Sequence, residues 1–127
     1  MKSNLQKLFT LTAYCVVFGG AVSCFGQIKT GGYKTVSVDD AEVAKAANFA
    51  VDAKAYELQQ AISLENVFKA ERQTVAGTNY RLCLEIYAPS ANEDEDGVTI
   101  YIQTVIFKNL KSEYKITSWE ESDCGEK

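Results

Sequence analysis

Few side chains in this sequence are suited to catalysis, because the chain contains no histidine. Without histidine there is no Ser-His-Asp or Cys-His nucleophile arrangement, and no zinc site of the usual mixed Cys/His kind. The 17 Asp and Glu residues would need a pocket and shifted pKa values to act as paired catalytic carboxylates. No sequence pattern places them in such a pocket, so the composition argues against an enzyme.

One acidic segment has the opening spacing of a calcium-binding loop, with Asn92, Asp94, Asp96 and Gly97. The twelfth position of that loop is Gln103 rather than the bidentate Glu that calcium needs, and the flanking pattern is strand-like. An exposed acidic hairpin with an Asp-Gly turn explains the segment better. We therefore expect neither a metal nor another cofactor.

Residues 1–26 have the pattern of a secretory signal peptide. Lys2 and Lys7 are basic, residues 8–18 form an apolar run, and small residues follow that run. The run is shorter than the roughly 20 apolar residues that a membrane span needs. We expect cleavage before Gln27 and secretion of the remainder of the chain.

The secreted product, residues 27–127, would be one small acidic domain. It contains 11 basic and 17 acidic residues, which give a net charge of −6. Nucleic acid is an unsuitable partner for such a chain, because phosphate binding needs a basic surface. A second interpretation of the N-terminal segment stays open, since residues 21–24 loosely resemble a lipoprotein box that would anchor the protein through Cys24.

The first element expected after the signal is a helix. Asp39 and Glu42 have the spacing of a capping box, and small and apolar residues then recur at spacings of three and four. This pattern predicts a helix from about residue 40 to about residue 58. Residues 27–37 show no periodicity long enough to predict an element.

After the helix the periodicity changes to two, which is typical of strands with one buried face. Four alternating runs are separated by turn signals at residues 76–78, 93–97 and 108–111. The sequence therefore predicts an α+β domain, in which one N-terminal helix packs on a four- to five-stranded antiparallel sheet.

Two cysteines remain after removal of the signal, in a compartment that permits a disulfide. Alternation places Cys83 on the face of the sheet away from the helix. Its strand and the last strand are separated by one strand, or about 9 to 10 Å, which is too far for a direct bridge. Cys124 lies beyond the last strand, so the tail could curl over the outer face, and we expect a Cys83–Cys124 bridge; two free thiols are the alternative.

Three segments resemble the cystatins, especially the plant and invertebrate forms. They are Gly31-Gly32 before the helix, Ala-Asn-Phe-Ala-Val at residues 47–51 on it, and Gln-Thr-Val-Ala-Gly at residues 73–77 in the first hairpin. The pentapeptide fits the family's Gln-x-Val-x-Gly signature at every fixed position. The pentapeptide alone would be weak evidence, but the three segments and their spacing together carry the resemblance over residues 28–121.

The resemblance implies a reversible inhibitor of papain-like cysteine proteases. Cystatins insert an N-terminal arm and two hairpins into the protease cleft, and no covalent chemistry is needed. By position, Gly31 would be the hinge of the arm, Val75 the tip of the first hairpin, and Gln73 and Gly77 the residues that fix its turn. The residues expected to contact the protease are Thr30, Gly31, Gly32, Gln73, Thr74, Val75, Ala76, Gly77, Asn109 and Leu110.

The second hairpin departs from the family pattern. Inhibitory cystatins commonly carry Pro-Trp there, whereas residues 108–111 read Lys-Asn-Leu-Lys, with Leu110 as the only apolar residue. With a weaker anchor, the resemblance implies a preference for cathepsin L-type and papain-type endopeptidases over cathepsin B-type enzymes. The alternative is a non-inhibitory cystatin-fold module that serves binding or defence. A monomer and a domain-swapped dimer both stay open.

Overall fold

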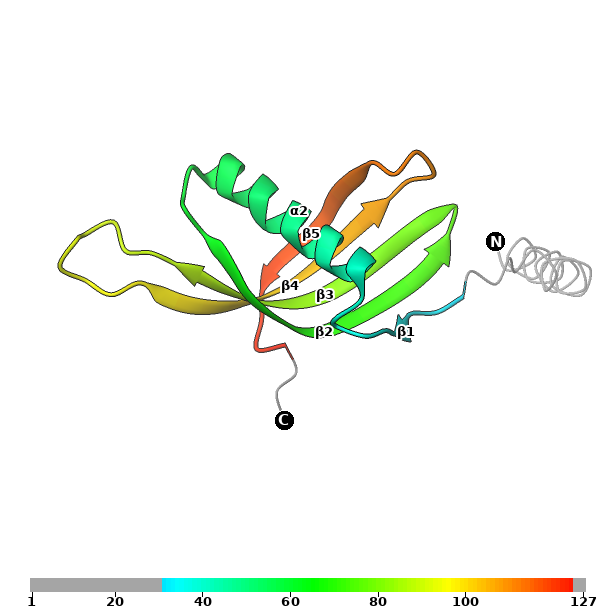
Figure 1. Ribbon diagram of the computed structural model, residues 1–127, viewed down its shortest axis with the longest axis horizontal. Coiled ribbons are helices and arrows are strands. Elements are labelled where there is room, and N and C mark those ends of the chain that lie inside the picture. Colours follow the sequence, from blue (N-terminus) through cyan, green and yellow to red (C-terminus); the bar gives the residue numbers. More distant parts are fainter. Residues whose placement is uncertain (1–30, 125–127) are drawn as a thin grey trace, which may run out of the picture.

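The computed structural model describes residues 31–124. Figure 1 shows one helix lying across one face of a curved antiparallel sheet of five strands, whose spatial order follows the chain. The elements are β1 (Lys34–Thr35), α2 (Ala41–Leu58), β2 (Ser63–Val75), β3 (Gly77–Ala88), β4 (Val98–Lys108) and β5 (Tyr114–Glu121). The α+β prediction is therefore confirmed. The predicted signal peptide, Cys24 and Thr30 lie outside the described residues, within which no helix is long and apolar enough to cross a membrane.

Helix α2 begins and ends within a residue of the predicted bounds, but its cap differs from the prediction. Asp40, not Asp39, is the N-cap, and its Oδ1 accepts a hydrogen bond from the backbone N–H of Glu42 at 2.8 Å. The predicted capping box was wrong, because the Glu42 carboxylate contacts Lys45 and Lys108. The helix ends at Gln59, which adopts the left-handed conformation with φ 53°.

The core lies between α2 and the face of β2, β3 and β4 toward it. Small residues on the helix let its backbone approach the sheet closely, while the strands contribute branched side chains that fill the space. Thr104 is the one buried polar residue in the described part of the chain, and its hydroxyl donates to the carbonyl of Ser118 at 2.7 Å. The buried residues of this core include Val43, Ala46, Ala47, Ala50, Val51, Tyr80, Leu82, Leu84, Ile86, Ile102 and Ile106.

Strand β1 lies in a segment where the sequence predicted no element. It has only two residues, which pair with Arg72 and Glu71 of β2, and two residues are too few to produce a period. Most of β2 is therefore the edge of the sheet. Its pairing with β3 is interrupted by irregularities at 64–66 and at 67–69, each of which leaves an extra residue in β2.

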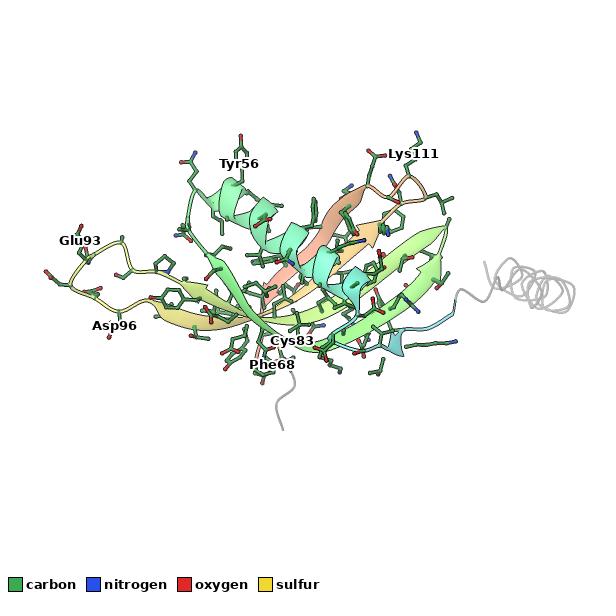
Figure 2. All side chains as sticks on the ribbon, in the orientation of Figure 1. Tyr56, Phe68, Cys83, Glu93, Asp96 and Lys111 are labelled. Atoms are coloured by element: carbon green, nitrogen blue, oxygen red, sulfur yellow. A yellow bond between two sulfur atoms is a disulfide. The ribbon has the colours of Figure 1, made fainter. Side chains whose placement is uncertain are left out.

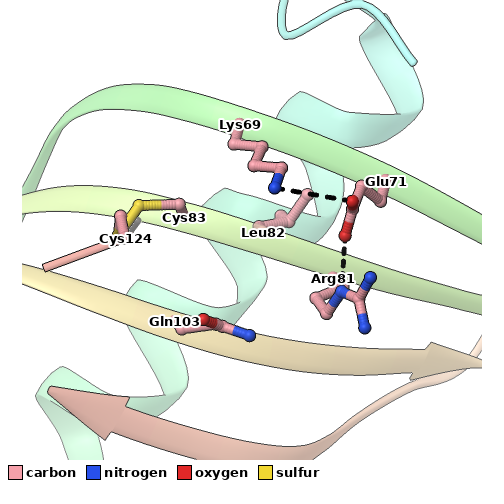
Figure 3. A pocket seen from close by; sticks show the side chains of 7 residues that line it. All are labelled: Lys69, Glu71, Arg81, Leu82, Cys83, Gln103 and Cys124. Carbon is pink, nitrogen blue, oxygen red and sulfur yellow. Dashed lines mark hydrogen bonds and ion pairs between the residues drawn. A yellow bond between two sulfur atoms is a disulfide. The ribbon is translucent and has the colours of Figure 1, made fainter. Parts of the chain in front are cut away.

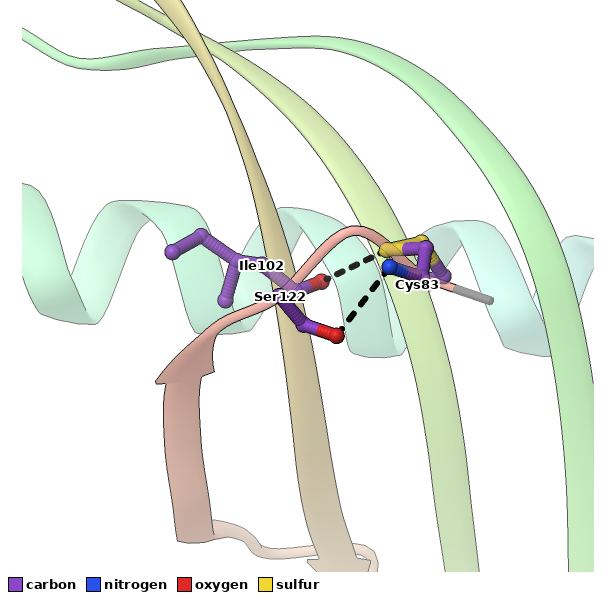
Figure 4. The surroundings of a disulfide bond; sticks show 4 residues. Cys83, Ile102 and Ser122 are labelled. Atoms are coloured by element: carbon purple, nitrogen blue, oxygen red, sulfur yellow. Dashed lines mark hydrogen bonds between the residues drawn. A yellow bond between two sulfur atoms is a disulfide. The ribbon is translucent and has the colours of Figure 1, made fainter. Parts of the chain in front are cut away.

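The expected disulfide is present. After β5 the chain crosses β4 on the outer face, where the N–H of Ser122 donates to the carbonyl of Tyr101 at 2.9 Å. This brings the Cα of Cys124 to 5.7 Å from the Cα of Cys83 in β3 (Figure 4). The bridge therefore ties the C-terminal tail over the sheet face that the helix does not cover.

Candidate functional site

The three described segments expected to contact a protease lie at one end of the sheet (Figure 1): residues 31–32, 73–77 and 109–110. The β2–β3 hairpin turns at Ala76, and the β4–β5 hairpin closes beyond the Lys108–Tyr114 pair. Because Lys34 pairs antiparallel with Arg72, residues 31–33 before β1 lie toward the same end. The acidic β3–β4 hairpin projects from the opposite end. One edge of the molecule thus presents two turns and a terminal arm, and we call it the wedge edge.

The first hairpin of the wedge edge is a tight turn with Ala76 at its tip. Val75 and Gly77 are paired across it, so the tip is Ala76. The sequence had predicted Val75 as the tip, which is one residue too early. Thr74 and Ala76 are exposed, whereas Val75 is half-buried. Behind the turn, the side chain of Asn79 donates to Oε1 of Gln73 at 3.0 Å, which supports the predicted role of Gln73 in fixing the hairpin.

Gly77 fixes the position of the first hairpin against the second. Its φ of 120° is disfavoured for residues with a side chain. A Cβ at this position would also lie 2.5 Å from the carbonyl oxygen of Lys108 and 2.8 Å from the ring of Phe107. The absence of a side chain therefore lets the two hairpins lie side by side. The sequence had indicated only the turn conformation.

The second hairpin is held by Asn109 and presents Leu110. The Asn109 Oδ1 accepts hydrogen bonds from the backbone N–H groups of Lys111 and Glu113, each at 2.9 Å. The Leu110 side chain is 83% exposed. Asn109 is thus a structural residue of the turn, and Leu110 is the exposed apolar residue of this turn.

The base of the second hairpin is fixed to the helix by an ion pair. The Nζ of Lys108 donates to Oε2 of Glu42 at 2.6 Å. This bond lowers the pKa of Glu42 and raises the pKa of Lys108. Below it, Phe49 of α2 stacks on Tyr114 of β5 with ring centroids 5.3 Å apart.

Comparisons with known proteins show the family of this chain. A family model described as "Aspartic acid proteinase inhibitor" matches residues 35–122. Salivary cystatin-L2 of the tick Ixodes scapularis is 34% identical, and the alignment covers 85% of this chain and 93% of that protein. The chain belongs to the cystatin family.

Solved structures show the same fold for this cystatin. The salivary cystatin of the soft tick Ornithodoros moubata matches with a TM-score of 0.59 at 22% identity, over 72% of this chain and 97% of that one. Mialostatin, a gut cystatin of the hard tick Ixodes ricinus, matches with a TM-score of 0.59 at 15% identity, over the same shares.

The arm of this cystatin is anchored behind its two glycines. The guanidinium of Arg81 lies over the ring of Tyr33, with Cζ 4.0 Å from the centroid. Gly31 and Gly32 are exposed, and a Cβ on either would meet no atom of the described chain within 4 Å. The fold itself therefore does not require glycine at these two positions, in contrast to position 77.

The outer face of this cystatin contains a hollow of about 230 Å³ beside the disulfide. Figure 3 shows that its charged side chains already contact one another: Glu71 accepts from Arg81 and pairs with Lys69. The pKa of Glu71 is lowered chiefly by its hydrogen bond to Arg81. Gln103 lines this hollow, far from the acidic hairpin, so it does not complete the calcium-like pattern. No group of three potential metal ligands occurs in residues 31–124.

Proposed function

We propose that this cystatin is a secreted, reversible inhibitor of papain-like cysteine endopeptidases, which it blocks by inserting the wedge edge into the protease cleft. The observation that carries the proposal is the close packing of Gly77 on the carbonyl of Lys108. This contact sets the two hairpins side by side, with the arm along the first of them. The family membership supports the same function, because the relative with 34% identity is a salivary cystatin.

The shape of the wedge edge explains how it could inhibit a protease without a covalent reaction. A protease cleft is a concave slot that binds extended backbone, and the edge offers two rigid turns of complementary shape. Rigid partners lose little conformational freedom on docking, which is why protease–inhibitor interfaces of ordinary size are among the tightest known. In this cystatin the rigidity comes from Gly77, Asn109 and the Glu42–Lys108 pair.

The proposed roles follow from position on the edge. Val75 and Ala76 approach the catalytic cysteine, Gly31 and Gly32 let the arm run close to the protease surface, and Leu110 anchors the second hairpin. Leucine offers less contact area than an aromatic anchor. We therefore propose a preference for cathepsin L-type and papain-type targets over cathepsin B-type enzymes, whose cleft is covered by a loop that the inhibitor must displace.

The test is inhibition of papain and of a cathepsin L-type protease by purified residues 27–127. We expect nanomolar inhibition that Val75→Asp abolishes. The matched control is Val98→Asp, since Val98 is an exposed valine at the opposite end of β4, and this variant should inhibit like the wild type. Absence of inhibition at micromolar concentration would reject the proposal and favour the non-inhibitory binding module.

A second candidate is inhibition of aspartic proteases, favoured by the family model that matches residues 35–122. A pepsin-type protease in the same assay separates the two candidates. Inhibition of that enzyme, unchanged by Val75→Asp, would show that this cystatin acts on aspartic proteases through a different surface.

A further inference from the structure

The wedge edge carries a charge opposite to that of the whole domain. Residues 27–127 have a net charge of −6. The three segments that form the edge, residues 31–35, 72–80 and 108–115, contain a single acid, Glu113. They contain five cations, namely Lys34, Arg72, Lys108, Lys111 and Lys115.

Two of these cations face each other in the sheet. Lys34 of β1 and Arg72 of β2 are direct cross-strand partners, and both are exposed. Neither makes an ion pair with any residue of the described range 31–124. Like charges in directly opposed positions destabilise a strand pair. The repulsion between Lys34 and Arg72 therefore lowers the stability of the free protein. An anionic partner placed over the two side chains would relieve that repulsion.

The acids that dominate the net charge lie at the far end of the sheet. Residues 82–107 contain five acids and no Lys or Arg, and four of the acids are consecutive at 93–96. Figure 2 shows Glu93 and Asp96 at one end of the molecule and Lys111 at the other. Ten residue steps along β4 separate the two ends by about 33 Å.

This separation decides which charge a docking protease meets. The Debye length is about 10 Å at an ionic strength of ~0.1 M, so the distal acids are screened from a partner at the wedge edge. The acids closer to the edge are Asp39, Asp40 and Glu42 at the start of α2, and Glu71 in β2. Asp40 accepts a hydrogen bond as the helix cap, Glu42 pairs with Lys108, and Glu71 pairs with Lys69 and Arg81. Lys34, Arg72, Lys111 and Lys115 are the edge cations that remain without such a pair among residues 31–124. The local charge of the edge is consequently positive.

We propose that this cationic edge selects proteases whose cleft rim is acidic, and that it does so by accelerating association. This rests on the proposed function and names the partner more closely. Exposed charges at the rim of an interface act mainly on the association rate constant and on its salt dependence, whereas dissociation depends on the buried contacts.

The experiment measures association and dissociation rate constants by stopped flow, with two papain-like proteases chosen for acidic and basic cleft rims. With the acidic-rim protease, we expect the association rate constant to fall at least about tenfold between ~10 mM and ~1 M salt. With the basic-rim protease it should stay level or rise. A salt-independent rate constant for the acidic-rim enzyme would overturn the proposal.

Two triple variants separate the wedge charges from the net charge. At an ionic strength of ~0.1 M, where the distal acids are screened from the edge, neutralising the edge with Lys34→Gln, Arg72→Gln and Lys111→Gln should slow association about tenfold and change dissociation less than about twofold. Neutralising the distal loop with Glu93→Gln, Asp94→Asn and Glu95→Gln should leave both constants unchanged. Removing three cations changes the net charge of residues 27–127 from −6 to −9, and removing three acids changes it to −3. Slower association of the edge variant together with equally faster association of the distal variant would overturn the proposal, because net charge would then be responsible.

Arg72→Glu separates a role of Arg72 in association from a role in stability, because the two measured quantities should change in opposite directions. It replaces the like-charge pair with an opposite-charge pair to Lys34, so thermal stability should rise while association slows. A variant that is less stable and associates at the wild-type rate would contradict the role assigned to Arg72. Failure to inhibit either protease at any salt concentration would instead reject the proposed function, so the two failures are distinguishable.

Discussion

The Nζ of Lys108, the last residue of β4, lies 2.6 Å from Oε2 of Glu42 in the first turn of α2. The two residues are 66 positions apart in the chain. Their contact joins the helix to the base of the second hairpin, while the carbonyl of the same Lys108 contacts Gly77 of the first hairpin. Lys108 therefore links the helix and both hairpins through its side chain and its backbone.

Acid should weaken this link. The folded-state pKa of Glu42 is lowered. Its contribution to the stability of the folded protein is therefore present above the unfolded pKa, which is about 4.3. That contribution is lost as the pH falls through the folded-state pKa. The pKa of Lys108 is raised instead. Its contribution to stability is therefore present below about pH 10.4 and is lost only as the pH rises above that value. Thermal melts of Glu42→Gln should depend less on pH between ~3 and ~6 than those of the wild type. Glu65→Gln, at an exposed acid of β2, should follow the wild type.

Gly77→Ala should disturb both hairpins at once. The substitution places a Cβ against the Lys108 carbonyl at a φ of 120°, so we expect a loss of about 1 to 3 kcal/mol in the free energy of unfolding. Inhibition should weaken as well, because the hairpins move apart. Urea denaturation measures the first effect.

Gly31→Ala is the matched control for Gly77→Ala. It adds a methyl group where no described atom lies within 4 Å, so the melting temperature should not change. Inhibition should still weaken if the arm passes close to the protease. A loss of stability equal to that of Gly77→Ala would contradict the contrast between the two glycines.

Leu110→Trp should tighten inhibition. Leu110 stands exposed on a turn that Asn109 holds in place, and an aromatic anchor in an interface is commonly worth about 2 kcal/mol, or roughly thirtyfold in affinity. Inhibition constants for cathepsin L-type and cathepsin B-type proteases should both fall. Val98→Trp at the far end of β4 should change neither. Equal constants for the two enzyme classes, with no gain from Leu110→Trp, would exclude the second hairpin from the interface.

Loss of the disulfide should reduce stability and spare inhibition. The Cys83–Cys124 bridge closes a separation of 41 residues, which corresponds to about 3 to 4 kcal/mol in the chain-entropy model. Cys83 is six residues from the first hairpin turn, or about 20 Å along β3. The paired Cys83→Ala and Cys124→Ala variant should therefore melt earlier with an unchanged inhibition constant. Intact-mass measurement of two free thiols in the wild type would contradict the bridge itself.

Periodicity sufficed to predict the main elements. The spacing of small residues on α2 and the alternation along β3 and β4 determine which faces are buried, so the helix bounds and the face of Cys83 were both predicted correctly. Strand β1 was missed because two residues carry no period. Its pairing depends on β2, which lies nearly 40 residues later.

The details of the wedge edge depend on long-range contacts that sequence spacing does not encode. Glu42 fits a capping box with Asp39, but the competing cation at position 108 takes its carboxylate. Gly77 fits a turn signature, but its closest neighbour is the carbonyl of Lys108 on another strand. The tip at Ala76 rather than Val75 follows from the pairing of Val75 with Gly77 across the turn.

The irregularities of β2 have a consequence for self-association. Strand β1 pairs with β2 at Glu71 and Arg72, and the N–H of Val36 donates to the carbonyl of Ala70. The length from Ser63 to Lys69 is therefore an open sheet edge with backbone groups that a second chain could pair with. The bulges at 64–66 and 67–69 bend this edge away from the flat geometry that intermolecular strand pairing needs. Deleting Glu65 and Phe68, the extra residues, would straighten the strand, and we expect the deletion variant to aggregate edge to edge more readily than the wild type.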